Sequence, residues 1–471
     1  MENFSDFKVW GWVLLFSALF GSLLVGNVMK RKIPLLKQSL IPTSVLGGAV
    51  LLIVEGVYKL ITGDVMFDTP IFGGNGTANL EIITYHALAL GFIASTLKPS
   101  AAKLTKKRSV EIFNTGVTTV ATYLVQGIFG LGITMLAAAT FMPEFFEAAG
   151  VLLPFGYGQG TGQAMNYGNI YEIDFGFEGG KTFGLTIAAL GFLSSALGGV
   201  VHLAVAKRRG KLNIRPQTSG FLSGEDIEGE GEIPMQESLD KLTFELAFVL
   251  VSYALTYGIM FALAKIAPGM NSLIYGFNFL IGVLSATLVK FIIKMLRKTK
   301  LMNREYLNSF LMTRISNFFF DVMIVAGVAA IRLDALGNYW LILAILGVVG
   351  IIITYVYNRF VAKKLFPEYH QEQFLMMYGM LTGTASTGTI LLREIDPDFK
   401  TPASDNMVYQ NFPAIVFGFP MMFLATLAPK KPMLTLIIFV LFFLALNLIL
   451  FRSFIFRRRG GTASKDEPQD Q

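Results

Sequence analysis

The chain contains no cysteine and carries little charge, since Lys, Arg, Asp and Glu make up only 15% of its 471 residues. Without cysteine, disulfides, zinc-thiolate sites and thiol nucleophiles are all excluded. Histidine is nearly absent as well, and His86, His202 and His370 are too scattered along the sequence to suggest a metal cluster. With no evident pairing of a nucleophile and a base, we do not expect an enzyme.

Apolar side chains are abundant by contrast. They make up 53% of the residues, and the mean hydropathy of +0.57 is well outside the range of a soluble enzyme of this length. One bilayer crossing takes about 20 apolar residues. Eleven runs of suitable length cover residues 9–29, 40–60, 80–97, 110–139, 182–206, 242–266, 273–295, 307–331, 339–361, 407–427 and 433–456. The sequence therefore predicts an all-α polytopic membrane protein.

Basic residues follow alternate apolar runs. They gather in residues 30–37, 98–108 and 207–211, whereas the loop after the second run has Asp64 and Asp68 and no basic residue between them. Because positive charge in short loops resists translocation, the amino terminus is expected outside and the carboxyl terminus in the cytoplasm. This distribution also assigns the net charge of +7 to membrane topology, so nucleic acid is not an expected partner.

Two further apolar stretches, residues 148–171 and 373–395, are interrupted by glycines and polar residues. The first contains GYGQGTGQ, which begins at Gly156, and the second contains GTASTGT, which begins at Gly383. The alternation of basic loops holds only if both stretches return to the side they came from, as re-entrant loops do. The glycines and polar residues indicate that the backbone of both stretches is not helical throughout. Unpaired peptide groups in hydrocarbon cost several kcal/mol each, so non-helical backbone at membrane depth must line a cavity or be buried in protein.

The chain divides into two similar halves. Residues 1–206 and 242–428 each contain five predicted spans, with an interrupted stretch between the fourth and the fifth, and the polar segment 207–241 reads as a cytoplasmic linker. An odd number of spans per half predicts two inverted repeats, as in many secondary transporters. Residues 429–456 are an extra transmembrane helix, and residues 457–471 are expected to be a disordered cytoplasmic tail.

The tips of the two interrupted stretches should meet near the middle of the membrane. Helix amino termini at such turns suit a carboxylate, and exposed carbonyls and hydroxyls suit sodium. The candidate substrate-binding residues are Gln159, Gly160, Thr161, Gly162, Gln163, Asn166, Gly383, Thr384, Ser386, Thr387, Arg393, Gln410 and Asn411. The candidate sodium ligands are Thr161, Thr384, Ser386, Asn317 and Asp321.

Each of these interpretations has an alternative. The glycines of GYGQGTGQ would also suit close helix packing. Arg314, Asn317 and Asp321 lie on one helical stripe, so Arg314 and Asp321 could form a structural ion pair instead of serving an ion site.

Three motifs, YGQGTGQAM (residues 157–165), IPTSVLGG (residues 41–48) and GTASTGT (residues 383–389), resemble the bacterial sodium/glutamate symporter family over roughly residues 9–427. That family has Gly-Gly-x-Gly in its first re-entrant loop, and Tyr157 stands at the first of these positions. The resemblance implies sodium-driven uptake of glutamate or a similar dicarboxylate across the bacterial cytoplasmic (inner) membrane. Sodium would be the coupling ion, with no other cofactor, and the re-entrant loops would form the site.

The resemblance also implies an elevator-like, alternating-access movement within a homodimer embedded in lipid. A sodium/proton antiporter that uses Asp321 is the alternative, because antiporters share inverted repeats, broken helices and a buried Asp. A channel would not explain why the two interrupted stretches come as an inverted pair.

Overall fold

The computed structural model describes residues 4–99, 105–210, 214, 240–302, 304–337, 339–397 and 399–457, with the side chains of residues 455–457 left aside. Most of the predicted linker and nearly all of the predicted tail lie outside these residues. Every regular element within them is a helix. By length and composition, ten of these helices are able to cross a membrane, which confirms the prediction of an all-α multi-pass membrane protein.

The ten helices coincide with ten of the predicted spans. They are α1 (Phe7–Lys32), α3 (Thr43–Thr62), α4 (Gly76–Leu97), α5 (Lys106–Thr140), α7 (Gly180–Arg208), α9 (Lys241–Ile266), α11 (Asn278–Lys298), α12 (Ser309–Ala329), α13 (Trp340–Leu365) and α18 (Pro432–Leu450). The remaining predicted span, residues 407–427, is part of a pair of helices, α16 (Pro402–Tyr409) and α17 (Asn411–Leu427), bent by 45°.

Three further helices, α6 (Leu152–Phe175), α14 (His370–Leu381) and α15 (Ala385–Arg393), form the interrupted stretches. Short helices connect the long ones: α2 (Pro34–Gln38), η1 (Met66–Asp68), η2 (Pro70–Phe72), η3 (Glu147–Val151), η4 (Pro268–Met270), α10 (Asn271–Gly276), η5 (Leu333–Leu336) and α19 (Arg452–Arg457). The predicted span at 273–295 is therefore divided between α10 and α11, and the one at 433–456 between α18 and α19.

Helix ends are fixed by residues that satisfy free backbone groups. The Thr105 side chain accepts a hydrogen bond from the Arg108 N–H at the start of α5, and the Asn308 side chain accepts one from the Leu311 N–H at the start of α12. Gly63 ends α3 with a φ of 80°, a conformation that glycine adopts without strain. The second predicted span starts at Thr43 and not at residue 40, because Pro42 occupies the cap position.

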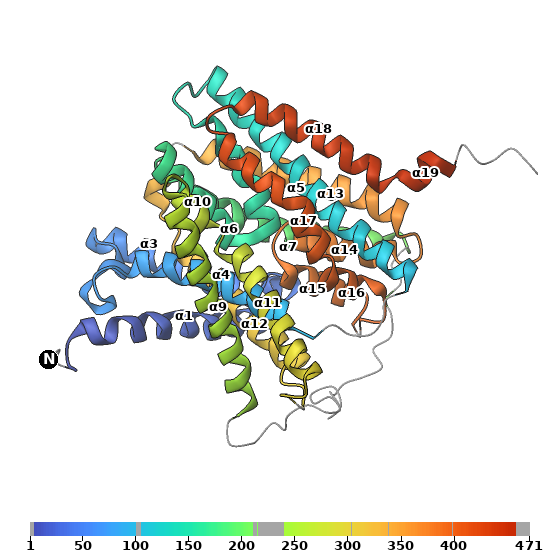
Figure 1. Ribbon diagram of the computed structural model, residues 1–471. Coiled ribbons are helices and arrows are strands. Elements are labelled where there is room, and N and C mark those ends of the chain that lie inside the picture. The colour runs from blue at the N-terminus through green and yellow to red at the C-terminus, as the bar shows by residue number, and fades with distance from the viewer. Residues whose placement is uncertain are drawn as a thin grey trace, which may run out of the picture.

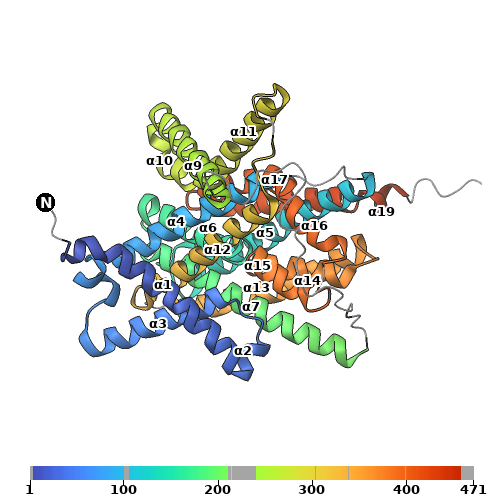
Figure 2. The same ribbon diagram turned by 90° about the horizontal axis from the view of Figure 1, so that it is seen from below.

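The long helices form a bundle around a central pair, α4 and α12, which pack against each other. Helix α3 also packs on α12, and α11 packs on α4. Figure 1 shows α1 and α3 at the left and α18 across the top. Seen from below in Figure 2, α9, α10 and α11 project on one side and α1, α2 and α3 on the other, with α4, α6 and α12 between them.

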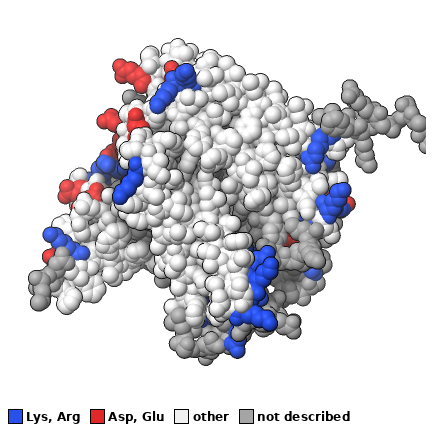
Figure 3. Space-filling view, in the orientation of Figure 1, with Lys and Arg blue, Asp and Glu red and all other residues white. Residues whose placement is uncertain are grey.

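Charged side chains lie toward two opposite ends of the bundle. In Figure 3 one row follows the left edge and another lies at the right and lower right, and the broad band between them shows almost none. The left row is mixed in sign, whereas the right row is nearly all Lys and Arg. An uncharged band between two charged ends is what a bilayer-spanning protein requires.

Ion pairs join helix ends at each end of the bundle. At one end, named here the Glu81 end, Lys181 at the start of α7 pairs with Glu81 at the start of α4 at 2.7 Å. At the opposite end, named the Lys107 end, Lys107 at the start of α5 pairs with Glu368 just before α14 at 2.7 Å, and Arg108 lies 3.6 Å from Asp405 of α16.

Candidate functional site where two broken helices meet

The first broken helix is α6, which is interrupted at a single residue. Gly160 has φ 78° and ψ −169°, a conformation that costs any residue except glycine of order 1–3 kcal/mol. The rest of GYGQGTGQ is helical. The interruption expected from the composition of GYGQGTGQ is therefore confined to one residue, because one glycine is enough to break the helix.

The neighbouring glycines of this stretch allow close packing instead. A Cβ on Gly156 would lie 2.8 Å from the Ala188 backbone N in α7, and one on Gly162 would lie 2.9 Å from Leu88 Cβ in α4. Gly158 faces the ring of Tyr123, whose hydroxyl donates to the Gly158 carbonyl at 3.1 Å. The packing alternative therefore holds for these three glycines but does not account for Gly160.

The second break lies between α14 and α15, at residues 382–384. The Thr387 hydroxyl closes this turn, because it accepts from the Thr384 N–H at 2.7 Å and donates to the Gly379 carbonyl at 2.9 Å. A Cβ on Gly388 would lie 2.7 Å from the Met376 carbonyl oxygen, so the two arms pack tightly. Thr387 was predicted to bind substrate, but its hydroxyl is used to hold the turn.

The two arms of each broken segment end at the same end of the bundle. The first segment begins where Thr134, near the end of α5, donates to the Glu147 carbonyl at 2.5 Å, and it finishes where Asp174 accepts from Ser272 at 2.9 Å. Both ends belong to the Glu81 end, since Phe145 and Glu172 line one hollow together with Glu81 and Lys181. The second segment begins beside the pair of Lys107 and Glu368 and leads into α16, which returns to Arg108.

The two breaks touch each other. A Cβ on Gly160 would lie 3.0 Å from Thr384 Cγ2 and 3.7 Å from the Gly383 carbonyl oxygen. The second break and the arm of α6 before Gly160 also contact Gly191, in the middle of α7: a Cβ there would lie 2.6 Å from the Thr382 carbonyl oxygen and 3.2 Å from Tyr157 Cα. Since α7 spans the bundle, the breaks meet about halfway between its two ends.

Buried side chains from neighbouring helices hold the breaks in place. The Gln126 amide of α5 donates to the Leu381 carbonyl at 2.9 Å and to the Thr354 hydroxyl at 2.8 Å. The Tyr157 hydroxyl donates to the Gly347 carbonyl at 2.7 Å and lies 2.8 Å from the Ser194 hydroxyl. The Leu381 carbonyl, which the end of α14 leaves without a helical partner, is thereby satisfied, and the Tyr157 hydroxyl ties α6 to α7 and α13.

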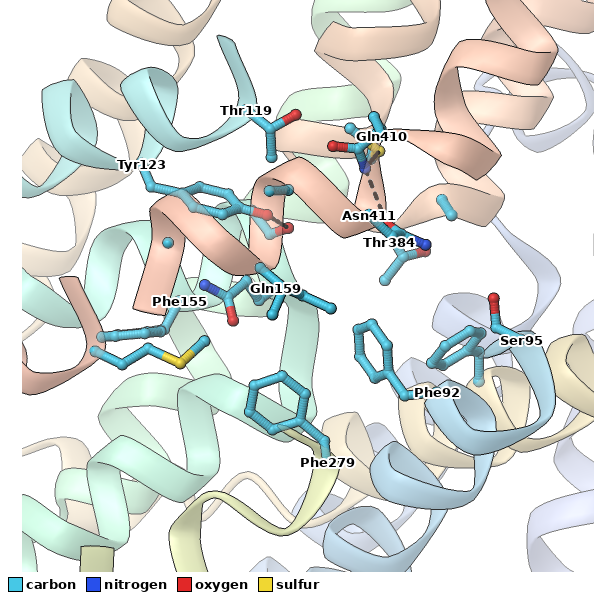
Figure 4. Close-up of a pocket in the computed structure, with 18 of the residues that line it drawn as sticks. Phe92, Ser95, Thr119, Tyr123, Phe155, Gln159, Phe279, Thr384, Gln410 and Asn411 are labelled. Atoms are coloured by element: carbon cyan, nitrogen blue, oxygen red, sulfur yellow. Dashed lines mark hydrogen bonds between the residues drawn. The ribbon is translucent and has the colours of Figure 1, made fainter. Parts of the chain in front are cut away.

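A cavity of about 150 Å³ opens at the meeting point (Figure 4). Its volume is far above the roughly 10–15 Å³ that one water needs. In Figure 4 the Gln159 side chain lies centrally, with Tyr123 and Phe155 on one side and Phe92 on the other. The polar lining residues are Ser95, Thr119, Tyr123, Gln159, Thr384, Gln410 and Asn411, and most of the rest are Phe and Met. Among the described lining residues none is charged.

Four of the predicted site residues line this cavity: Gln159, Thr384, Gln410 and Asn411. Gln410 is buried and donates to the Asn411 side-chain oxygen at 3.0 Å, while its own Oε1 has no hydrogen-bond partner among the described residues. An unpaired buried amide oxygen carries a cost of about 1–3 kcal/mol. A solute or water in the cavity would remove that cost.

Other predicted site residues are buried in helix contacts around the breaks. Thr161 donates to the Met323 carbonyl of α12 at 3.2 Å. Asn166 donates to the side-chain oxygen of Gln163 at 3.0 Å and to the Gly276 carbonyl at 3.3 Å. These residues follow Gly160 on the arm that leads back to the Glu81 end.

Ser386 and Arg393 lie away from the cavity lining. Ser386 is half-buried in the first turn of α15. Arg393 is exposed, and its guanidinium lies over the ring of Phe399 at 5.2 Å. Its predicted contact with an anionic substrate is therefore absent from this arrangement, because its position at the carboxyl end of α15 directs it away from the break.

The predicted ion-site residues of α12 lie on a different face from the cavity. Phe320 and Met323 line the cavity, whereas Asn317 is exposed and Asp321 lies beside Ser44 of α3. The structure therefore does not bring Asn317 and Asp321 together with Thr161 and Thr384. Within the described residues no ion pair joins Arg314 to Asp321; Arg314 lies over the Phe310 ring at 5.0 Å instead. The structural-pair alternative is wrong.

Sequence reasoning missed the contribution of α5. Thr115, Thr119, Thr122 and Gln126 recur at spacings of three and four along its buried side, and Thr119 and Tyr123 reach the cavity. This spacing places them on one helical face. Polar residues at such a spacing inside an otherwise apolar run were the signal that could have found them.

Four helix ends converge on the cavity. The arm of α6 that follows Gly160 and helix α15 begin there, and the arm that precedes Gly160 and helix α14 end there. Helix amino termini carry a positive partial charge that suits an anion, and carboxyl-terminal carbonyls suit a cation. The arrangement can therefore hold an anion and a cation next to each other without any charged side chain.

No model of a known protein family matches this chain, and a comparison with curated proteins found no match either.

Proposed function

We propose that the protein is a sodium-coupled secondary transporter, and not an enzyme, which imports glutamate or a related dicarboxylate. The observation that carries this proposal is the contact between Gly160 and Thr384 beside a cavity in the middle of the bundle. Paired broken helices whose ends face a common cavity are typical of secondary transporters. A helical bundle without transport activity would not need to break two helices at one point.

The packing supports two inverted repeats, each with a re-entrant loop. Helix α3 packs on α12, its proposed counterpart α11 packs on α4, and the proposed counterparts α5 and α13 pack on each other. One broken segment enters from the Glu81 end and the other from the Lys107 end. Helix α18 lies outside both repeats and packs on α5, where Phe439 faces Gly127.

The charge distribution supports the predicted orientation. The Lys107 end carries the mainly basic row of Figure 3, so we assign it to the cytoplasm and the Glu81 end to the outside. In the bacterial inner membrane, the amino terminus would then lie outside the cell membrane and the carboxyl terminus would lie in the cytoplasm.

We assign the substrate carboxylates to the amino termini at the breaks and to the neutral amides of Gln159, Gln410 and Asn411. Backbone carbonyls and the Thr384 hydroxyl would hold sodium, a hard cation that takes oxygen ligands. The choice of glutamate within this class rests on the resemblance of the sequence motifs to the sodium/glutamate symporter family.

The proposed mechanism is alternating access. Sodium would bind first and order the two breaks, and the anion would then bind between them before one part of the bundle moves, in an elevator-like way and within a homodimer. Coupling requires that sodium raise the affinity for the anion, because an ion that binds two states equally shifts neither.

Uptake of labelled glutamate into proteoliposomes tests the proposal. An inward sodium gradient should drive accumulation above equilibrium, and an equal potassium gradient should not. Thr384→Val should raise the sodium concentration that gives half-maximal uptake, whereas Thr389→Val should not, since the Thr389 hydroxyl bonds only within and beside α15, to Ala385 and Met407. Uptake independent of sodium, or proton release on addition of sodium without any amino acid, would contradict symport.

A further inference from the structure

A second cavity lies at the Lys107 end, away from the site described above. It has a volume of about 420 Å³ and lies between the end of α7, the end of α13 and the start of α14. Its basic or imidazole-bearing lining residues are His202, Arg209, Arg359, Lys363 and His370. None of its described lining residues is acidic. The cavity therefore concentrates positive charge without a carboxylate to balance it.

The inner wall of this cavity is fixed by Arg359. Its guanidinium lies 5.8 Å from the Tyr355 ring centre and 5.9 Å from that of Phe374, and its Nη1 donates to His202 Nδ1 at 3.0 Å and to the Tyr355 hydroxyl at 3.3 Å. Because arginine only donates, the proton of a neutral His202 ring lies on Nε2. Rings and imidazole thus hold the guanidinium in place, and among the described residues no carboxylate pairs with it.

The outer wall is formed by exposed charges. Arg209 and Lys363 are both exposed at the cavity mouth, and neither makes an ion pair with any described residue. Two carboxylates close in sequence to the start of α14 do not line the cavity: Glu368 pairs with Lys107, and Glu372 is buried, with 7% of its surface exposed.

The start of α14 adds to this positive field. His370 is the first residue of this 12-residue helix, and it lines the cavity together with Gln371, the second residue. A helix amino terminus carries a positive partial charge and unpaired N–H groups. A fixed guanidinium, exposed Arg and Lys side chains and a helix amino terminus around one cavity are the groups that bind a phosphate group.

We propose that this cavity is a binding site for a phosphate-bearing anion, either the headgroup of an anionic lipid or a soluble phosphate. Such an anion contacts α7, α13 and α14 together, and α14 leads directly to the second break. Occupancy therefore ties the arm of the second break to two long helices. The site stands independently of the transport proposal, since it shares no lining residue with the central cavity.

Binding to the full-length protein tests the site without any transport measurement. Two experiments distinguish a soluble phosphate from a lipid headgroup. In the first, the detergent-purified protein is titrated with inorganic phosphate and its melting temperature is measured at each concentration. In the second, the protein is purified from mixed vesicles and the phosphatidylglycerol that it retains is compared with the phosphatidylcholine. Stabilisation by phosphate identifies a soluble ligand, and selective retention of phosphatidylglycerol identifies a lipid. The absence of both effects would overturn the proposal.

The charge variants must remove the site without unfolding the protein. The double variant Arg209→Gln, Lys363→Gln changes only exposed side chains and should weaken binding at least about tenfold. The control Arg208→Gln, Lys364→Gln removes the same charge from exposed neighbours that do not line the cavity, and it should bind as the wild type does. Equal loss in both variants would mean general charge attraction only, and no loss in the first would exclude the site.

Discussion

The Thr384 side chain lies against the backbone of Gly160, so that a Cβ at residue 160 would come within 3.0 Å of Thr384 Cγ2. This contact joins two segments that are far apart in the sequence and that enter the bundle from opposite ends. Thr384 itself and Gln159, next to Gly160, line the central cavity. Glycine at residue 160 is required by the φ angle, and the contact with Thr384 Cγ2 leaves little room for a side chain.

Gly160→Ala should lower the free energy of unfolding by about 1–3 kcal/mol, because alanine does not tolerate this φ and ψ. Sodium-dependent uptake should be lost with it. Thermal unfolding in detergent and uptake into proteoliposomes measure the two effects. Gly132→Ala is the control, because that helical glycine has open space around it and alanine should leave stability unchanged or raise it slightly. A Gly160→Ala protein as stable and active as the control would contradict the role of the break.

Gln126→Ala should destabilise the second break. It leaves the buried Leu381 carbonyl and the Thr354 hydroxyl without their donor, at a cost of about 1–3 kcal/mol for each group. Faster hydrogen exchange in residues 376–384 than in the wild type would measure the effect locally. Gln38→Ala, at an exposed glutamine of α2, should leave exchange there unchanged. Identical exchange in both variants would show that Gln126 does not hold the break.

Tyr157→Phe removes a hydroxyl that bridges α6, α7 and α13. Gly347 is an interior residue of α13, so its carbonyl loses the tyrosine donor but is not left unpaired, and the free energy of unfolding should fall by about 0.5–1.5 kcal/mol, seen as a lower melting temperature. Tyr257→Phe is the matched control, because Tyr257 is 58% exposed and its loss of a hydroxyl should have no effect. A melting temperature unchanged by Tyr157→Phe would mean that this bridge contributes nothing to stability.

The sequence predicted the spans well and the geometry of the breaks only in part. Apolar runs must match the thickness of a bilayer, so their length alone located the long helices. The alternation of basic loops indicated that residues 148–171 and 373–395 do not cross. The extent of the breaks was overestimated, because glycine composition does not distinguish Gly160, which needs a positive φ, from Gly156 or Gly158, which need only room.

The partners of the breaks could not be predicted from the sequence. Gly191 lies in an ordinary apolar span, and only the path of α7 shows that the second break and the arm of α6 before Gly160 pack on it. Arg393 and Asp321 were predicted to belong to the site because charged residues are rare in membrane segments. The structure places both outside the cavity lining, on other faces of their helices. Neutral residues of α5 face it instead, and Thr119 reaches the lining.

Asp321→Asn separates the proposed symporter from a sodium/proton antiporter. Asp321 lies beside Ser44 and outside the cavity lining, so this variant should retain sodium-dependent glutamate uptake within about twofold of wild type. The comparison is made by sodium titration of uptake in the two proteins. Loss of sodium dependence in Asp321→Asn would place the ion site between α3 and α12 and would favour the antiporter.

Labelling of single cysteines at the two breaks tests the central claim most directly, and the cysteine-free chain gives no background. Gln159→Cys and Thr384→Cys both face the central cavity, and Thr140→Cys at the exposed end of α5 serves as the control. Glutamate together with sodium should protect residues 159 and 384 from a membrane-permeant maleimide and leave residue 140 reactive. Protection of only one break, or of neither, would contradict a substrate site shared by both.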